Sequence, residues 1–467
     1  MVRPKAPEKG WKAHHSVWLM LFIAWSMCYL DRAITGPVIS WMIANDLELI
    51  KGAYEPHALG GLIGSMFFAG YMLTQFPAGF LGDRYGRRTM LVISTVWAGT
   101  VTVLSGMARG LNAFVAARVL TGLGEGAYYS NDRALVAQVS PPGKVGTGMG
   151  VVFVGLAVGL TAATVTAPWL IETAEGFMGQ AAWSFPFFLF GPPTVVVGLI
   201  MHRRLPAGAV ETYRGALPRL VAYSLFFLLV IMGIFHLSLS LRLGVLWQTV
   251  LVLLIALVLV GLIYSRIGSS SAPVLRDRSL LLMYVSAIPI LFTLWFFGFW
   301  ALLVVSESSG LGLSGAAVYA GLFGLANAIG YPLGGMVCDR IPGIAGRKRL
   351  YALVCVTVAV LVALMVPSIQ AEDLTAMAIL LFLIGVAFAA MQTVHMTLTA
   401  DLSPPELMGQ SFGMWNLVAE SGALLSPVIC SHLRDTTESW DAAIVLTSAL
   451  LVASAALVMV VPRTVRY

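Results

Sequence analysis

Charged residues and cysteines are scarce in this sequence. Only 11% of the 467 residues are Asp, Glu, Lys or Arg, whereas 58% are hydrophobic and the mean hydropathy is +0.87. No soluble protein of this length needs so much apolar surface. The four cysteines have neither the spacing of a disulfide framework nor that of a metal site. We therefore expect them to pack as small buried hydrophobic side chains.

Motifs of the common enzyme classes are also missing. The sequence contains no Walker loop, no metal-ligand spacing and no nucleophile elbow. We expect no catalytic residues, no metal and no cofactor, and the lack of a phosphate loop argues against an ATP-driven pump. The formal net charge of +6 does not indicate nucleic-acid binding, because its distribution follows membrane topology instead.

Apolar runs of about 20 residues recur along the whole chain, and each is long enough to cross a bilayer as a helix. The first run contains two charges and lacks a small-residue cleavage site, so we do not expect a signal peptide. The sequence predicts an all-α polytopic membrane protein with fourteen transmembrane helices. The runs are 16–42, 57–81, 89–108, 111–138, 147–171, 182–202, 219–239, 243–265, 279–305, 313–337, 350–369, 373–400, 410–432 and 440–462.

The distribution of Lys and Arg predicts the orientation. If the N-terminus is cytoplasmic and the runs alternate, 21 of the 28 Lys and Arg residues fall in cytoplasmic tails and loops and four fall outside. Cytoplasmic loops carry such an excess of positive charge. We therefore expect both termini in the cytoplasm, in a plasma membrane, which would be the inner membrane of a Gram-negative bacterium.

The sequence contains an internal repeat. Residues 137–150 match residues 400–414 at an offset of 263, and 82–88 is echoed by 338–349. Parallel repeats of six helices are a recurring transporter plan, with the substrate site between them. The predicted organisation is an N-tail (1–15), a six-helix bundle (16–204), linkers with an inserted two-helix hairpin (205–278), a second six-helix bundle (279–462) and a C-tail (463–467). The role of the hairpin stays open among oligomer contact, lipid seal and packing.

Three motifs resemble those of the major facilitator superfamily. GFLGDRYGRR (79–88) is similar to its loop between helices two and three, residues 335–349 to the degraded second copy, and RVLTGLG (118–124) to its fourth-helix motif. The resemblance implies the major facilitator fold and alternating access. It assigns gating to Asp83, Arg84, Arg87, Arg88, Arg118, Asp339 and Arg340. The loop charges also suit orientation alone, and Arg118 suits a structural hydrogen-bond hub better than a substrate contact.

Two further stretches resemble the anion:cation symporter family. They are YLDRAITGP (29–37) and GLGEGAYYSNDR (122–133), of which the second contains an Asn-x-Arg pair at 131 and 133. In that family the first-helix Arg binds a substrate carboxylate, and carboxylates beside it and on the fourth helix couple protons. The resemblance carries these roles to Arg32, Asp31 and Glu125. The double tyrosine at 128–129 and the acidic residue 132 depart from the pattern.

The physical chemistry of these residues agrees with that assignment. Arg stays charged and presents a planar fork of donors that matches a carboxylate. Burial favours a neutral Glu125, whereas a nearby Arg favours the anion. A substrate anion at Arg32 would weaken that attraction, and Glu125 would then take up a proton. The alternative is a structural buried ion pair, although intramembrane charges usually serve function.

The second half of the chain offers fewer ionisable groups. Gln392 and His395 share a face of the tenth core helix, and Asn416 and Glu420 lie four residues apart on the eleventh. We expect Gln392, His395 and Asn416 to contact substrate, together with Tyr29 and Tyr128, and Glu420 to couple protons. Packing is an equal alternative for His395.

These observations predict a proton-coupled symporter of an organic anion, such as a carboxylate or sugar acid. We expect it to act as a monomer among membrane lipids, without nucleic acid. The alternative within transport is a proton-coupled exporter of a drug, a siderophore-like carboxylate or a lysolipid or sphingolipid. The fifth-helix run 150–170 lacks the Gly-Pro-rich antiporter motif, which counts against export. A non-transporting sensor would not need Glu125.

Overall fold

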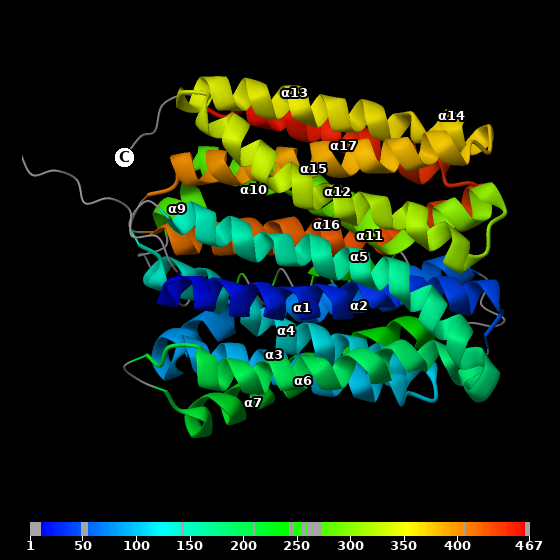
Figure 1. Cartoon of the computed structure of the whole chain (residues 1–467), viewed down its shortest axis with the longest axis horizontal. Coiled ribbons are helices and arrows are strands. Elements are labelled where there is room, and N and C mark those ends of the chain that lie inside the picture. Colours follow the sequence, from blue (N-terminus) through cyan, green and yellow to red (C-terminus); the bar gives the residue numbers. More distant parts are fainter. Residues whose placement is uncertain are drawn as a thin grey trace, which may run out of the picture.

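The computed structural model is a bundle of long, roughly parallel helices (Figure 1). It describes residues 11–47, 55–141, 144–208, 211–241, 272–404 and 407–462, with scattered positions between 244 and 261. The expected N-tail up to residue 10, the C-tail and most of the second inserted helix lie outside the described residues. The count of fourteen membrane helices therefore stays a prediction.

The first half of the chain forms one group of helices, drawn in blue to green in the lower part of Figure 1. Its closest pairings are α2 with α4, α1 with α5 and α3 with α6, so helices distant in sequence lie side by side. The helices are α1 (Ala13–Ala44), α2 (Pro56–Tyr85), α3 (Arg87–Gly106), α4 (Leu111–Val139), α5 (Val145–Met178), the short 3₁₀ helix η1 (Gly179–Ser184) and α6 (Phe185–Arg204).

The second half repeats this plan in the upper part of Figure 1. Its closest pairings are α12 with α15, α11 with α16 and α13 with α17. The elements are α9 (Ala272–Arg276), α10 (Arg278–Ser286), α11 (Ile288–Ser309), α12 (Leu313–Asp339), α13 (Gly343–Ala363), α14 (Met365–Gln370), α15 (Leu374–Leu402), α16 (Met408–Thr437) and α17 (Asp441–Val460).

Local sequence explains where several of these helices begin, break and end. The side chains of Asp277 and Asp373 accept backbone N–H bonds at the starts of α10 and α15. Gly310 ends α11 in the left-handed conformation, with φ of 69°. The runs expected at 279–305 and 350–369 each break into two helices, near Pro289 and Pro367, because proline lacks the N–H that continues a helix.

The first inserted helix, α7 (Tyr213–Ser240), packs on the N-terminal group against α2, α4 and α3. Its start is fixed by hydrogen bonds from Thr212 N–H to the Tyr85 carbonyl and between Tyr213 and His202. Leu225, Phe226 and other large apolar side chains of α7 are exposed. A helix with an exposed apolar face suits a lipid environment.

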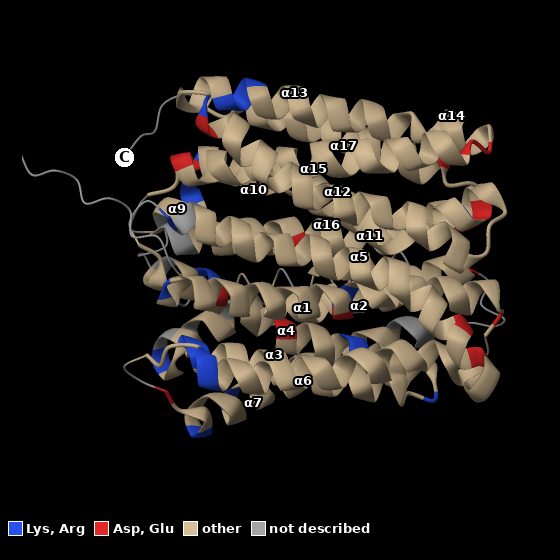
Figure 2. Cartoon of the chain, in the orientation of Figure 1, with Lys and Arg blue, Asp and Glu red and all other residues tan. Residues whose placement is uncertain are grey.

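Nine described helical stretches are long and apolar enough to cross a membrane. The long helices run between two ends of the molecule (Figure 1). We call the end that holds the start of α1 and the end of α17 the termini side, and the opposite end the far side. Lys and Arg gather on the termini side, at the left of Figure 2. This asymmetry agrees with the pattern of charge in the sequence.

The two groups of helices meet along α2 with α16, α5 with α12 and α1 with α11. Two glycines permit the closest approach. A Cβ atom on Gly61 would lie 2.3 Å from the Pro427 carbonyl oxygen, and one on Gly36 would lie 2.6 Å from the Phe299 carbonyl oxygen. Only glycine fits at such backbone contacts. Both contacts join the N-terminal group to the C-terminal group.

Candidate functional site

A buried ion pair lies halfway along the N-terminal group. Arg32 of α1 donates through Nε to Glu125 Oε2 of α4 at 2.6 Å, and the two side chains are 1% and 0% exposed. The structure therefore brings together two residues that were assigned to one site from sequence. A charge-assisted bond of this kind offsets part of the cost of burying both ions.

Asp31 lies beside this pair but faces the interior of the N-terminal group. Its carboxylate accepts a hydrogen bond from the Thr102 hydroxyl of α3. Asp31 Oδ2 and Glu125 Oε1 are buried, and neither has a hydrogen-bond partner among the described residues. Two buried carboxyl groups near one another favour a state in which one of them holds a proton.

Aromatic rings enclose the Arg32 guanidinium. Its central carbon lies 4.2 Å from the centre of the Tyr71 ring, 4.8 Å from Tyr29 and 5.4 Å from both Phe67 and Trp25. Such contacts stabilise a desolvated cation without neutralising it. The Nη2 atom of this guanidinium has no hydrogen-bond partner among the described residues.

The C-terminal group supplies the opposite wall. The Tyr29 ring stacks on Trp295 of α11 at 6.2 Å and 11°. Glu420 and Asn416 of α16 are 3% and 5% exposed, and neither Glu420 Oε2 nor Asn416 Nδ2 has a hydrogen-bond partner among the described residues. The expected coupling residue Glu420 is near enough to Arg32 to interact with it electrostatically, and the expected substrate residue Asn416 lies one turn before it on α16.

Gln392 also lies near this junction. Tyr331 of α12 donates to Gln392 Oε1 at 2.9 Å, which leaves the amide nitrogen as the group that can donate to a ligand. The Tyr331 ring stacks on Phe153 of α5 at 6.0 Å and 27°. Gln392 is therefore linked through Tyr331 to a helix of the other half, and substrate contact by Gln392 stays a prediction.

The structure places His395 and Tyr128 away from the junction. His395 is fully buried within the C-terminal group, where Trp415 donates to Nδ1 at 2.9 Å and Ser286 contacts Nε2 at 2.8 Å. Both ring nitrogens are engaged, and this supports the packing role. The Tyr128 hydroxyl points to the Leu21 carbonyl inside the N-terminal group. Substrate contact by either residue stays a prediction that this geometry does not support.

Arg118 is a hydrogen-bond hub in the far-side half of the N-terminal group. It is fully buried and donates to the hydroxyls of Thr35, Ser105 and Thr121 at 2.5–3.1 Å. These residues come from α1, α3 and α4. The geometry supports the structural role expected for Arg118 rather than direct contact with substrate.

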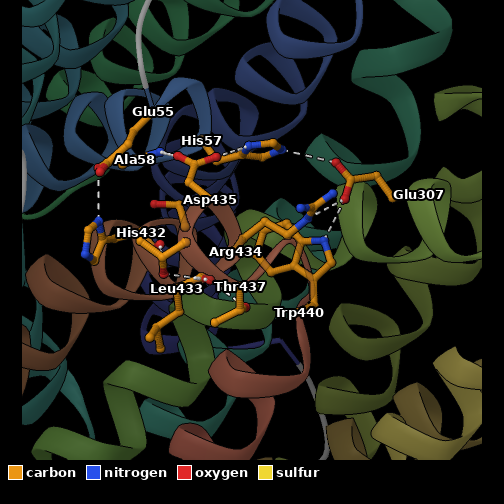
Figure 3. A network of polar contacts seen from close by, with 12 residues as sticks. Glu55, His57, Ala58, Glu307, His432, Leu433, Arg434, Asp435, Thr437 and Trp440 are labelled. Carbon is orange, nitrogen blue, oxygen red and sulfur yellow. Dashed lines mark hydrogen bonds and ion pairs between the residues drawn. The ribbon is translucent and has the colours of Figure 1, made fainter.

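A polar network joins the two halves at the far side (Figure 3). The His57 ring at the start of α2 contacts Asp435 of α16 at 2.5 Å and Glu307 of α11 at 3.2 Å. Asp435 also accepts the Ala58 N–H at 2.8 Å. A carboxylate at a helix N-terminus is favourable, so this contact ties the end of α2 to the other half.

Three further contacts extend this far-side network. His432 contacts Glu55 at 3.0 Å, again across the two halves. Glu307 also accepts from Arg434 Nε and from the Trp440 indole, both at 2.9 Å. All hydrogen bonds between the halves that join two described residues belong to this network.

Comparison with protein families identifies the fold. The family model described as Major Facilitator Superfamily matches residues 21–320 and 300–466. The chain belongs to the Major Facilitator Superfamily. Its arrangement of two packed helix groups with a buried polar site between them is therefore that of a transporter, not an enzyme.

Several curated members of the superfamily are similar along the whole chain. A "Probable galactarate/D-glucarate transporter" of Escherichia coli (strain K12) is 22% identical and is covered over 91% of its length and 94% of this chain. A "D-galactonate transporter" of Escherichia coli O6:H1 is 22% identical over 98% of both chains. Shorter matches include "Probable anion transporter 6, chloroplastic" of Arabidopsis thaliana, 33% identical over 29% of this chain and only 25% of that protein.

Solved structures of superfamily members share the fold. A bacterial homologue of the human lysosomal transporter Spinster, in an inward-facing and occupied conformation, has a TM-score of 0.68 at 16% identity and covers 97% of this chain and 98% of its own. A POT family transporter in complex with a thioalcohol-conjugated peptide has a TM-score of 0.72 at 12% identity. The match covers 96% of this chain and 99% of that transporter.

The superfamily's loop motif lies on the termini side, as expected. Arg88 donates to the carbonyls of His202 and Leu205, and its Nε lies 3.9 Å from Glu211. Arg84 is exposed and packs on Tyr85, and the Asp83 side chain lies outside the described part. Arg87 lines a cavity of about 380 Å³, together with residues 206–208 and Glu211.

The second copy of the motif is arranged differently from the expectation. Asp339 and Arg340 are exposed, whereas the ion pair in this loop joins Arg347 to Asp401 at 2.6 Å. A gating role for Asp339 and Arg340 stays a prediction. No local sequence pattern indicates the role of Arg347, because its partner lies 54 residues away at the end of α15.

Sequence reasoning missed the aromatic residues around the site and the far-side network. Trp25, Phe67 and Tyr71 look like ordinary apolar positions of membrane helices in the sequence, although their rings surround Arg32. The network pairs residues more than 370 positions apart, such as Glu55 with His432. The one available signal was the clustering of His and acidic residues at the predicted helix ends.

Proposed function

We propose that this protein is a secondary active transporter that couples protons to the symport of an organic anion, a carboxylate or sugar acid, by alternating access. The observation that carries the proposal is the Arg32–Glu125 pair, buried among aromatic rings at the junction of the two halves. A fixed cation paired with a removable proton acceptor has the chemistry that anion–proton symport needs.

The coupling step follows from competition for Arg32. In the absence of anion, Arg32 binds the Glu125 carboxylate. A substrate carboxylate takes over the guanidinium, which leaves Glu125 buried without its cation and favours its protonation. Asp31, which is buried and adjacent to Arg32 in the chain, is a second carboxyl group that we expect to share that proton, and Glu420 near Arg32 is a third. Substrate and proton therefore bind together and leave together.

The orientation and the conformation belong to the same proposal. The excess of Lys and Arg on the termini side (Figure 2) supports cytoplasmic termini in a plasma membrane. The far side then faces the outside, and the far-side network holds it closed. We assign the described conformation to the inward-facing state of the cycle, in a protein that works as a monomer.

The similarity of the chain to sugar-acid transporters over its whole length supports this class of substrate. A binding experiment tests the proposal. Galactarate and D-galactonate should raise the melting temperature of purified wild-type protein, because ligands that bind only the folded state stabilise it. Arg32→Ala should abolish the shift, whereas Arg219→Ala, on the surface of α7, should preserve it. Binding that survives Arg32→Ala with near-normal affinity would refute the anion-receptor role.

A further inference from the structure

A second arginine near the site, Arg133, has buried donor atoms without hydrogen-bond partners among the described residues. The Arg133 side chain of α4 is 14% exposed, and its polar contacts with the described residues are to the Met149 sulfur at 3.6 Å and to Asp132 Oδ2 at 3.4 Å. Neither Nε nor Nη2 has a hydrogen-bond partner among the described residues. Buried guanidinium donors are usually satisfied, so these two point to a ligand.

Arg133 lies next to the Arg32 site, on the termini side of it. The central carbons of both guanidinium groups are 5.4 Å from the centre of the same Trp25 ring. One anion of moderate length can therefore reach both cations. Arg32 is 1% exposed and Arg133 is 14% exposed, so the second arginine is the more accessible of the two.

The surroundings of Arg133 match those of Arg32 in kind. Its guanidinium lies over the Phe153 ring at 4.0 Å and near the Tyr129 ring at 5.4 Å. Phe153 stacks on Tyr331, which in turn holds Gln392 of the C-terminal group. Aromatic faces and a free amide donor at the junction of the halves suit the hydroxylated chain of a sugar acid.

We propose that Arg133 forms a second anion subsite, which binds the distal carboxylate of an extended dicarboxylate whose first carboxylate is held by Arg32. This inference rests on the proposed function and narrows the substrate class from organic anions to dicarboxylates of about six carbons. Arg presents paired donors that match a carboxylate, and two such contacts at fixed spacing select both charge and length.

Asp132 lowers the affinity of this subsite for an anion. Its Oδ2 accepts the Trp25 indole N–H at 2.5 Å and is the carboxylate nearest to Arg133. A substrate carboxylate must compete with Asp132 for the guanidinium. Replacement of Asp132 by Asn keeps an oxygen for the Trp25 bond and removes the competing charge. We therefore expect opposite effects of the two substitutions: Arg133→Gln should weaken the binding of dicarboxylates, and Asp132→Asn should strengthen it.

The test compares matched acids that differ at one end only. Dissociation constants are measured by calorimetry for galactarate against D-galactonate and for adipate against hexanoate. Wild-type protein should bind each dicarboxylate at least about tenfold more tightly than its monocarboxylate partner. Arg133→Gln should reduce that ratio to about one while the monocarboxylate affinity changes less than about twofold. Arg133→Lys should keep part of the preference, and Asp132→Asn should increase it.

The controls separate this inference from the proposed function. Arg219→Gln removes a surface arginine and should leave every constant unchanged. Equal affinity of the wild-type protein for the dicarboxylate and the monocarboxylate of each pair would overturn the second subsite alone. An equal loss of affinity for both acids in Arg133→Gln would do the same. Should Arg133→Gln fail to fold, an unchanged preference in Asp132→Asn would also overturn it. If none of the four acids binds, the proposed function fails as well.

Discussion

The two buried arginines at 32 and 118 show how the same residue type serves two purposes. Arg118 is bonded to three hydroxyl groups and has no carboxylate at bonding distance among the described residues. Arg32 is bonded to Glu125 and covered by rings. Hydroxyl groups hold a cation in place, whereas a carboxylate can be exchanged for a substrate. We therefore expect the group bonded to each arginine, a hydroxyl or a carboxylate, to decide whether that arginine is structural or binds substrate.

The role of Glu125 can be separated from that of Arg32. Glu125→Gln keeps the size of the side chain and its acceptor oxygen but cannot bind and release a proton. We expect this variant to exchange labelled substrate across proteoliposomes at a rate within about tenfold of wild type and to lose accumulation driven by a pH gradient. Thr100→Ala on the outer surface of α3 is the control. Gradient-driven accumulation that persists in Glu125→Gln would contradict the coupling role.

Removal of Arg118 should affect stability before it affects binding. Arg118→Leu leaves three buried hydroxyls without their shared donor, although Ser105 and Thr121 also bond to their own helices. We expect a loss of about 1–3 kcal/mol in unfolding free energy, seen as a lower melting temperature. The affinity for substrate should stay within about threefold of wild type. A stable variant that no longer binds galactarate would instead place Arg118 in the binding site.

At the scale of helices, the close approach of α2 to α16 depends on Gly61, which has no side chain. The Cβ of Gly61→Ala would lie 2.3 Å from the Pro427 carbonyl oxygen, too close for any real contact. We expect this variant to separate the far-side ends and to cost about 1–3 kcal/mol. Gly150→Ala in open space on α5 is the control and should be neutral or slightly stabilising. Equal melting temperatures for both variants would refute this account of the contact.

The sequence predicted the helices well and their breaks less well. Apolar runs placed the described core helices because a bilayer demands about 20 apolar residues per crossing. The first run, expected at 16–42, forms Ala13–Ala44. Pro289 and Pro367 coincide with breaks, whereas Pro37 and Pro168 lie inside α1 and α5 without ending them. Neighbouring helices decide which prolines interrupt a membrane helix, and that information is not local.

At the scale of the whole molecule, the far-side network links movement of the two halves to a few charged contacts. His57 contacts both Asp435 and Glu307, so one side chain of the N-terminal half joins two helices of the other. The sequence predicted a site at Arg32, Asp31 and Glu125 because a charge inside an apolar run stands out, and the structure places Arg32 and Glu125 in contact. The sequence did not identify this network, because polar residues at helix ends are ordinary and their partners are set by tertiary packing.

The network should hold the far side closed. His57→Ala leaves Asp435 with the Ala58 N–H alone and removes one contact of Glu307. We expect the equilibrium to shift toward a far-side-open state by on the order of 1–3 kcal/mol. Spin labels at Asn45→Cys and Glu438→Cys, both exposed on opposite halves, measure the shift as a longer distance. A distance distribution identical to that of the labelled parent would show that the network does not act as a latch.

The most direct test of the central claim is to measure proton movement during uptake of substrate. Proteoliposomes loaded with a pH-sensitive dye should acidify inside when galactarate is added outside to wild-type protein. Proteoliposomes that contain Arg32→Ala or Glu125→Gln should not acidify inside, although the Glu125→Gln variant should still exchange substrate. Uptake of galactarate by wild-type protein without acidification, or acidification that survives in Glu125→Gln, would contradict proton-coupled anion symport through the Arg32–Glu125 pair.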